Sequence, residues 1–241
     1  MKVLTIAATA CLLVQPVLAQ DMNRVGGFEI DRTEVSVRDF REFVEATGTV
    51  TAAERAGGGE VYEAGWVRKP GWTWQTPYGR SASDNEPAVH VTFAEAQAYC
   101  IWRGKRLPTD AEWMEAAYTE RRTDPPAPYR TGTTYPYPTG ETPDGANCLG
   151  DCGTTPAIDY SDVLTRGNGH APVGATMAGI NGLHDMGANV WEWVDGGDGD
   201  RKITRGGSWW YGASQMSRAH LASKPADTAV VYIGFRCARS P

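Results

Sequence analysis

The stretch from Arg121 to Pro156 constrains the fold of this chain most, because it is rich in Pro, Gly and Thr. This composition predicts a long loop region. A loop of this length stays ordered inside one domain when covalent links hold it or when it serves a function. The chain also contains nine tryptophans, whose large side chains can bury much of the area that helices and sheets bury elsewhere. We therefore expect little regular secondary structure.

Three short helices are nevertheless indicated, because a Ser or Thr stands at each expected N-cap, with Asp or Glu three residues later. The predicted helices run from Ser36 to Gly48, from Thr92 to Trp102 and from Thr109 through Ala117. The strand candidates are Val89–Val91, Ile203–Arg205 and Val230–Phe235. No internal repeat or domain boundary is visible, so residues 20–241 are expected to form one domain.

Residues 1–19 have the pattern of a signal peptide, with Lys2, an apolar run from Val3 to Val14, and Ala19 at the expected cleavage site. The apolar run is too short to span a bilayer, so no membrane span is expected. The remaining 22 basic and 29 acidic residues give a net charge of −7. This charge argues against nucleic acid or an anionic membrane as a partner. We expect a periplasmic or secreted protein.

Four cysteines remain after the predicted leader, and an even number in an exported chain favours disulfides. Cys148 and Cys152 lie close together in the long loop region, where a local disulfide would hold the loop. The alternative is a redox-active or copper-binding pair of thiols.

Several short motifs in a fixed order resemble the formylglycine-generating enzyme family, also called sulfatase-modifying factors, from about Phe28 to Arg239. The resemblance implies an α+β fold, irregular and related to C-type lectins. It also implies oxygen-dependent conversion of a sulfatase cysteine to formylglycine, with copper held by two cysteines, and a disulfide between Cys100 and Cys237. The motifs are Phe28–Val35, Pro87–Thr92, Ala98–Cys100, Gly104–Trp113, Gly182–Met186, Asn189–Trp193, Arg205–Trp209 and Gly234–Cys237.

The chain departs from this family where the two reactive cysteines belong, because it has Tyr211 and Met216 at those positions. A thioether can bind Cu(I), but a phenol does not replace the second soft ligand. Copper is therefore not expected at this position, and the chain is interpreted as a divergent member that lacks the catalytic cysteine pair. A second disulfide of the family would join Ala117 and Leu221, which are both apolar here.

The resemblance also implies structural calcium, because the family binds it through carboxylates and backbone carbonyls, the hard oxygen ligands that calcium prefers. One site would use the side chains of Asp185 and Glu192 with the backbone oxygens of Ala188 and Val190. In the alternative interpretation, Asp185 and Glu192 cap turns and pair with arginine. A second site would use Asn147 and the backbone oxygen of Cys148.

Three functional hypotheses remain. The first is an exported maturation or accessory factor that acts on a partner protein or a peptide-derived metabolite; as an enzyme it would resemble an oxidoreductase. The second is a non-catalytic, lectin-like binding module, since one fold serves many functions. The third is a formylglycine-generating oxidase with displaced copper ligands, Cys148 and Cys152. The residues expected at the floor of the pocket are Trp191, Ser208, Trp209, Tyr211, Met216 and Arg218.

Overall fold

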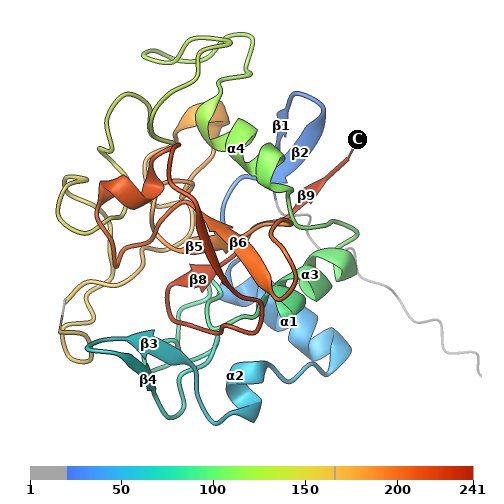
Figure 1. Ribbon diagram of the computed structural model, residues 1–241, viewed down its shortest axis with the longest axis vertical. Helices are drawn as coiled ribbons and strands as arrows, with labels where there is room; N and C mark the ends of the chain where they lie inside the picture. Colours follow the sequence, from blue (N-terminus) through green and yellow to red (C-terminus); the bar gives the residue numbers. More distant parts are fainter. Residues whose placement is uncertain (1–20, 166, 241) are drawn as a thin grey trace, which may run out of the picture.

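The computed structural model describes residues 21–165 and 167–240, so the predicted leader lies outside the described residues. The fold combines short helices with three small sheets joined by long connections, as expected (Figure 1). None of the helices in the described part of the chain has the length and apolar character that a membrane crossing requires. The helices are α1 Val37–Thr47, α2 Ala52–Arg55, α3 Phe93–Trp102, α4 Asp110–Tyr118 and the 3₁₀ turns η1 Ile180–Gly182 and η2 Ala213–Met216.

The three predicted helices are confirmed as α1, α3 and α4, and each begins where its cap was expected. The Ser36 hydroxyl accepts a hydrogen bond from the backbone N–H of Asp39, at 3.2 Å. Thr92 and Thr109 each form a complete capping box with the glutamate three residues later. These reciprocal bonds satisfy backbone groups that a helix N-terminus leaves without partners. The helix α2 was not predicted, although Thr51 forms the same kind of box.

The strands form one three-stranded, one two-stranded and one four-stranded sheet, in the orders β1-β2-β9, β3-β4 and β7-β6-β5-β8. The predicted strand Ile203–Arg205 lies within β6, and β8 occupies the middle of the predicted strand Val230–Phe235. The strands are β1 Met22–Val25, β2 Phe28–Asp31, β3 Glu60–Tyr62, β4 Trp66–Arg68, β5 Trp191–Trp193, β6 Arg201–Arg205, β7 Ala222–Pro225, β8 Ile233–Gly234 and β9 Ala238–Arg239.

The predicted strand Val89–Val91 is wrong, because the backbone of His90 is left-handed, with φ 58°. A residue at positive φ interrupts the extended conformation that a strand requires. The fully buried imidazole of His90 lies with Nε2 3.0 Å from the carbonyl oxygen of Pro77. This contact and the backbone bond from His90 N–H to the carbonyl of Val230 hold the turn in place.

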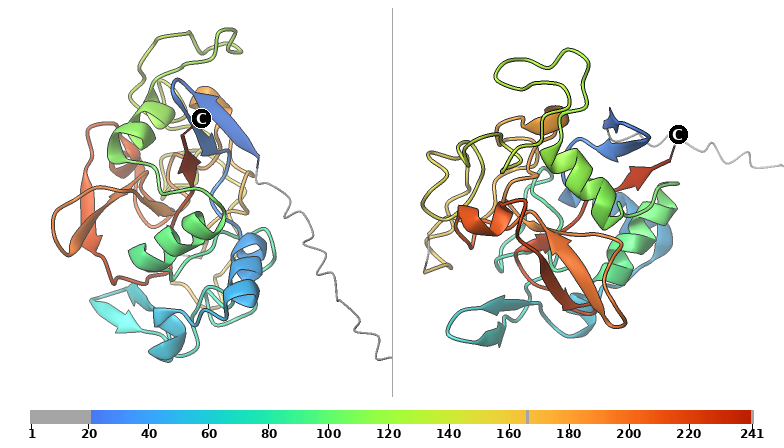
Figure 2. Two further views of the ribbon diagram at one scale, coloured as in Figure 1. Left: turned by 90° about the vertical axis from the view of Figure 1, so that its right-hand side faces the viewer. Right: turned by 45° about the horizontal axis from the view of Figure 1, so that its top comes forward.

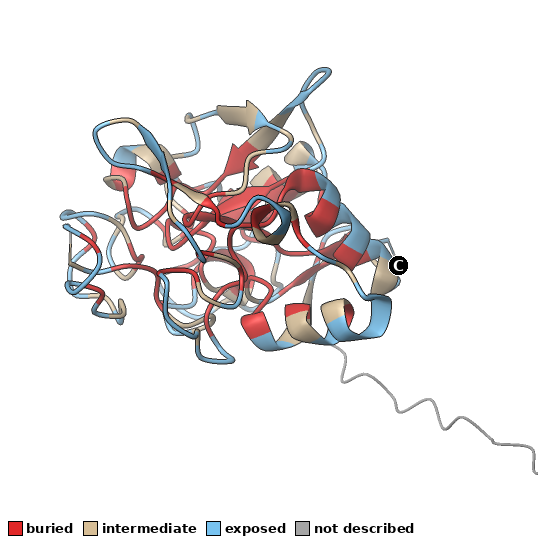
Figure 3. Cartoon of the chain, turned by 90° about the horizontal axis from the view of Figure 1, so that it is seen from below, coloured by how far each residue is buried: buried red, intermediate tan, exposed pale blue. Residues whose placement is uncertain are grey.

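Buried residues gather in the interior of the molecule (Figure 3), and several of them belong to the C-terminal segment. The segment from Ile233 to Ala238 is buried throughout. The strand β8 pairs in parallel with β5, and β9 pairs with β2. A disulfide between Cys100 and Cys237 joins this segment to α3. The C-terminal segment therefore links the sheets and helices that enclose the core (Figure 2).

The long loop region has the irregular structure that its composition predicts. Between the end of α4 and the start of η1, the described residues contain isolated bridges and turns but no helix or paired strand of the kind found elsewhere. A small apolar cluster of Tyr129, Tyr135 and Ile180 packs beneath it. The disulfide between Cys148 and Cys152 closes a tight turn within it. In this loop region, buried side chains and a disulfide therefore provide the order that hydrogen-bonded helices and strands provide elsewhere.

Candidate functional site

The six residues expected at the floor of a pocket do not form one group. Trp191 and the half-buried Tyr211 lie together, with ring centroids 6.0 Å apart. Met216 is buried on another side, in a cluster with Ala146, Cys152, Ala188 and Ala213. The Arg218 side chain is exposed and lines a shallow pocket of about 310 Å³ beside Tyr135 and Pro136. The positions of the expected cysteine pair therefore face different surroundings.

Ser208 and Trp209 are buried supports rather than an open floor. Ser208 has no exposed surface, and its carbonyl accepts the backbone N–H of Tyr211 at 3.0 Å. The Trp209 ring packs against the Trp210 ring with centroids 5.2 Å apart. The indole N–H groups of Trp191 and Trp209 have no hydrogen-bond partner in the described part of the chain. Buried donors of this kind normally find a partner, so a water molecule or a ligand group would be favoured near them.

A cleft opens between α2, the β3–β4 hairpin and β7. It has a volume of about 350 Å³, and we call it the β4–β7 cleft, after the strands of Trp66 and Lys224. The Lys224 ammonium lies 5.8 Å from the centre of the Trp191 ring. The hairpin, at the edge of the molecule (Figure 1), exposes 53% of Trp66. The cleft is lined by Glu60, Trp66, Arg68, Lys224 and Asp227, among others.

Two basic side chains in this region, Lys224 and His220, have pKa values below their usual range. Burial lowers the pKa of Lys224, and the nearby Arg201 lowers it further. Burial also lowers the pKa of His220, whose ring lies 5.6 Å from that of Trp191, so His220 is neutral at pH 7. Burial raises the pKa of Tyr232, and the adjacent Tyr211 adds to this effect. The cleft itself offers the aromatic ring of Trp66 and charged, hydrogen-bonding side chains, a combination that suits a peptide or a sugar.

A second group of charged residues is buried, and we call it the acid cluster: Glu34, Asp185, Glu192 and Arg236. Arg236 is fully buried, and its guanidinium donates hydrogen bonds to Glu192 at 2.7 to 3.0 Å. The Trp113 indole N–H donates to Glu192 as well, at 2.8 Å. Burial raises the pKa of Glu34 well above its usual value, and the charges of Asp185 and Glu192 raise it further.

Some contacts of the expected calcium ligands match the interpretation in which they cap turns and pair with arginine, and others are compatible with a calcium site. Glu192 pairs with Arg236, and Asp185 accepts hydrogen bonds from the Thr176 hydroxyl and the Gly174 backbone, both at 2.6 Å. The backbone oxygens of Ala188 and Val190 accept no hydrogen bond from the described residues, although both residues are buried. Both Asp185 and Ala188 are at positive φ, 62° and 59°. Buried carbonyls without partners beside excess carboxylates fit a cation.

The second expected calcium site lacks a carboxylate among its closest partners. Asn147 donates to the carbonyl of Gly169 and to the side chain of Asn189, and it accepts from the Thr155 hydroxyl. None of these partners carries a negative charge. The oxygen of the Asn147 side chain is therefore engaged in a neutral network.

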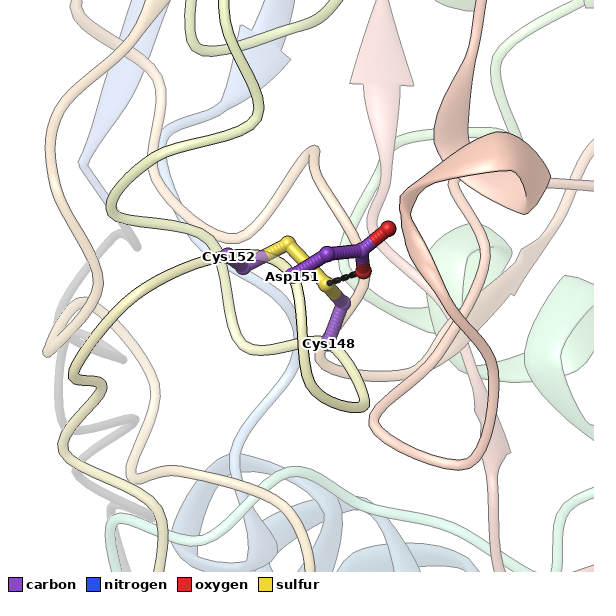
Figure 4. Close-up of side chains that lie close together, drawn as sticks. All are labelled: Cys148, Asp151 and Cys152. Atoms are coloured by element: carbon purple, nitrogen blue, oxygen red, sulfur yellow. Dashed lines mark hydrogen bonds between the residues drawn. A yellow bond between two sulfur atoms is a disulfide. The ribbon is translucent and has the colours of Figure 1, made fainter.

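The cysteines Cys148 and Cys152 form a disulfide, and Asp151 between them completes the group in Figure 4. One carboxylate oxygen of Asp151 lies 3.3 Å from the sulfur of Cys148. Among the described residues, this is the one group of three His, Cys, Asp or Glu side chains close enough to share a metal ion. The sequence had indicated the cysteine pair, but not the carboxylate beside it.

Sequence reasoning missed Arg236 as the partner of Glu192 and Glu34 as a neighbouring buried carboxylate, and it missed a buried network around His170. The Nε2 of His170 lies 2.7 Å from the carboxylate of Glu86, which also accepts the Tyr160 hydroxyl at 2.5 Å. These residues stand far apart in the sequence, so no local spacing pointed to them. Glu34 and Arg236 lie within two of the motifs that carry the family resemblance, and this was the signal in the sequence that could have identified them.

Comparisons with known proteins agree with this architecture. The family model described as "Sulfatase-modifying factor enzyme 1-like domain" matches residues 9–241. A formylglycine-generating enzyme from Thermomonospora curvata is 34% identical, over 90% of this chain and 84% of that protein. A mouse protein named inactive C-alpha-formylglycine-generating enzyme 2 is 32% identical, over 88% of this chain and 75% of that protein.

Solved structures show the same fold at lower sequence identity. PvdO from Pseudomonas aeruginosa superposes with a TM-score of 0.61 and 22% identity, covering 89% of this chain and 80% of that one. CarF superposes with a TM-score of 0.56 and 20% identity, over 89% and 86% of the two chains. With the motifs, the fold and the family match together, the chain belongs to the formylglycine-generating enzyme, or sulfatase-modifying factor, family.

Proposed function

We propose that this protein is an exported maturation or accessory factor that acts on a partner protein or a peptide-derived metabolite, without the two-cysteine copper chemistry. One observation carries the proposal: the four cysteines of the described residues are all paired, while Tyr211 and Met216 occupy the positions of the reactive pair. The copper chemistry implied by the family resemblance uses a pair of thiolates, and a disulfide sulfur is not a thiolate. The mouse relative whose name calls it inactive supports this proposal.

The β4–β7 cleft is the proposed binding site, because it combines volume, aromatic surface and a cation. Trp66 and Tyr62 project from the hairpin with ring centroids 5.4 Å apart and are 53% and 43% exposed. Exposed aromatic rings beside a cleft are typical of recognition surfaces. The Lys224 ammonium makes no ion pair within the described residues, so it is available to a carboxylate or a backbone carbonyl of the bound peptide.

Export is proposed from the sequence of residues 1–19, the acidic charge and the disulfides. Stable disulfides form in the periplasm or outside the cell, and they are rare in the cytosol. The proposed partner is therefore an exported protein or peptide-derived molecule.

A bound calcium ion is proposed for the acid cluster. Three buried carboxylates and one guanidinium leave a formal charge of −2 if all are ionised, and burial makes such an excess costly. The backbone oxygens of Ala188 and Val190, with Asp185 and Glu192, would hold the ion, which would supply charge compensation and order. Calcium should raise the melting temperature of the wild type and should not raise that of Asp185→Asn; an equal rise in both proteins contradicts the assignment.

The function is tested with the mature protein, copper, oxygen and a peptide that carries the cysteine motif of sulfatases. Mass spectrometry should find no aldehyde, whereas an aldehyde that requires Cys148 would favour displaced copper ligands.

The affinity of the protein for the same peptide, measured by fluorescence anisotropy, should fall in Trp66→Ala and Lys224→Met. The control is Ile101→Ala, because Ile101 is 63% exposed on α3, outside the cleft. Binding that is equal in all variants would exclude this cleft.

The same experiment separates the two remaining functions. A factor that processes its ligand changes the mass of a bound peptide or metabolite in a manner that depends on oxygen or metal. A lectin-like binding module retains its ligand unchanged under every condition. The exposed Trp66 and Tyr62 fit both, so turnover, rather than binding, decides between them.

A further inference from the structure

The two disulfides of this protein differ in their accessibility. Cys100 and Cys237 have no exposed surface and lie in the main core. Cys152 is also buried, but Cys148 is partly exposed and lies next to a pocket of about 260 Å³. Thiol–disulfide exchange requires a thiolate to reach one of the two sulfur atoms. An external dithiol can therefore attack the sulfur of Cys148 while the Cys100–Cys237 bond is shielded.

The carboxylate of Asp151 lies next to the Cys148–Cys152 disulfide. Its Oδ1 lies 3.3 Å from the sulfur of Cys148 and accepts the backbone N–H of Ala213 at 3.0 Å. Its Oδ2 has no hydrogen bond to the described residues. The hydrogen bond from Ala213 restrains the carboxylate on the side of Cys148, and Figure 4 shows Asp151 beside the disulfide. Preorganised ligands lower the cost of binding a metal.

We propose that reduction of the Cys148–Cys152 disulfide creates a zinc site, formed by the two thiolates and the carboxylate of Asp151. An exported dithiol attacks the sulfur of Cys148, and Cys152 leaves as a thiolate. The second thiol of the reductant then resolves the mixed disulfide. Two electrons and two protons pass to the protein, and the reductant becomes a disulfide. When zinc binds, the two thiol protons are released.

Charge explains why the reduced pair should take a metal ion. A carboxylate close to two thiols opposes their ionisation, so the thiols stay protonated until a cation compensates the three negative charges. Two sulfur ligands with one oxygen ligand match zinc, which accepts both kinds and often has three protein ligands with one open position. The pocket beside Cys148 provides space for a water molecule or a small ligand at the fourth position; it is also lined by Leu149, Asn168 and Trp209.

The state of this site would also affect the position of the segment that follows Ser208. The backbone N–H of Leu149 donates to the carbonyl of Tyr211 at 2.9 Å, and Asp151 accepts from Ala213. Cleavage of the disulfide loosens the turn that makes both contacts, and zinc restores a short link between Cys148 and Cys152. The occupancy of the site is thereby coupled to the position of Tyr211. This inference requires neither the β4–β7 cleft nor a peptide; it concerns the reduced form of the Cys148–Cys152 pair, whereas the proposed function rests on the oxidised form.

The experiment uses the mature protein and graded dithiothreitol, with alkylation and peptide mapping to identify reduced cysteines. Cys148 and Cys152 should be alkylated at a reductant concentration that leaves Cys100 and Cys237 joined. The selectively reduced protein, freed of reductant, should then bind one equivalent of Zn²⁺ in competition with a chromogenic chelator. Cys148→Ser should abolish binding, and Asp151→Asn should weaken it about tenfold or more.

The matched control is Asp144→Asn, because Asp144 is an exposed carboxylate of the same loop region that bonds to Thr142 instead. It should bind Zn²⁺ like the wild type, and melting curves show whether each variant is folded. The proposal is overturned if the two disulfides are reduced together. It is also overturned if the reduced, folded protein binds no Zn²⁺, prefers Cu⁺ without a contribution from Asp151, or binds zinc equally well in Cys148→Ser.

Discussion

Removal of each disulfide separately provides a quantitative test of how the irregular parts of this fold are stabilised. The cysteines of the two bonds are 137 and 4 residues apart in the sequence. The loop-entropy relation then gives about 5 kcal/mol for the Cys100–Cys237 bond and about 2 kcal/mol for the Cys148–Cys152 bond at 25 °C. The expected difference of about 3 kcal/mol is more reliable than either value, since the constant term of the relation cancels.

The assay compares Cys100→Ala/Cys237→Ala with Cys148→Ala/Cys152→Ala in guanidinium chloride, with tryptophan fluorescence as the signal. The first double variant should lose about 3 kcal/mol more of the free energy of unfolding than the second. Loss of the buried sulfur atoms adds a smaller packing cost in both variants. A difference below about 1 kcal/mol, or one of opposite sign, would refute the view that the long link acts by restricting the unfolded chain.

Two further predictions concern buried charges. Arg236→Met should lower the free energy of unfolding by about 3–5 kcal/mol, because Glu192 remains buried without its partner. Urea titration measures this, and Arg236→Met/Glu192→Gln should recover part of the loss; no recovery contradicts the pairing. Burial raises the pKa of Asp31 from 3.8 to about 6, although Lys105 opposes this. Because the folded state binds the proton more tightly, Asp31 costs about 3 kcal/mol above pH 6, and this cost disappears as the pH falls from about 6 to 4. Asp31→Asn should remove that part of the pH dependence in urea titrations at pH 4.5 and 7.5, whereas an unchanged profile would assign it to other groups.

Local signals in the sequence predicted the helices well. A capping residue and a glutamate three positions later depend on neighbours in the chain, so Thr92 and Thr109 marked the starts of α3 and α4 correctly. The strand predicted at Val89–Val91 failed for the opposite reason. Its apolar residues are buried, but the turn at His90 is set by contacts with Pro77 and Val230, which the local pattern does not reveal.

The arrangement of the site depended still more on distant contacts. The resemblance placed Tyr211 and Met216 at the expected cysteine positions, but it did not show that Met216 packs against Cys152 while Tyr211 faces Trp191. The β4–β7 cleft joins a hairpin near residue 66 to a strand near residue 224, and neither strand was predicted. The ion pair of Glu192 with Arg236 likewise forms across 44 residues, beyond any helical or strand period.

The buried position of the C-terminal segment has a consequence for how the protein is made. Ile233, Arg236 and Cys237 are synthesised after most of the residues they contact, and they supply the parallel partner of β5, the cation for Glu192 and the disulfide partner of Cys100. Until they emerge, the earlier residues have no complete core to join. A nascent chain that lacks this segment is therefore expected to remain without a complete core. Folding during synthesis, as well as stability, depends on residues 233–237.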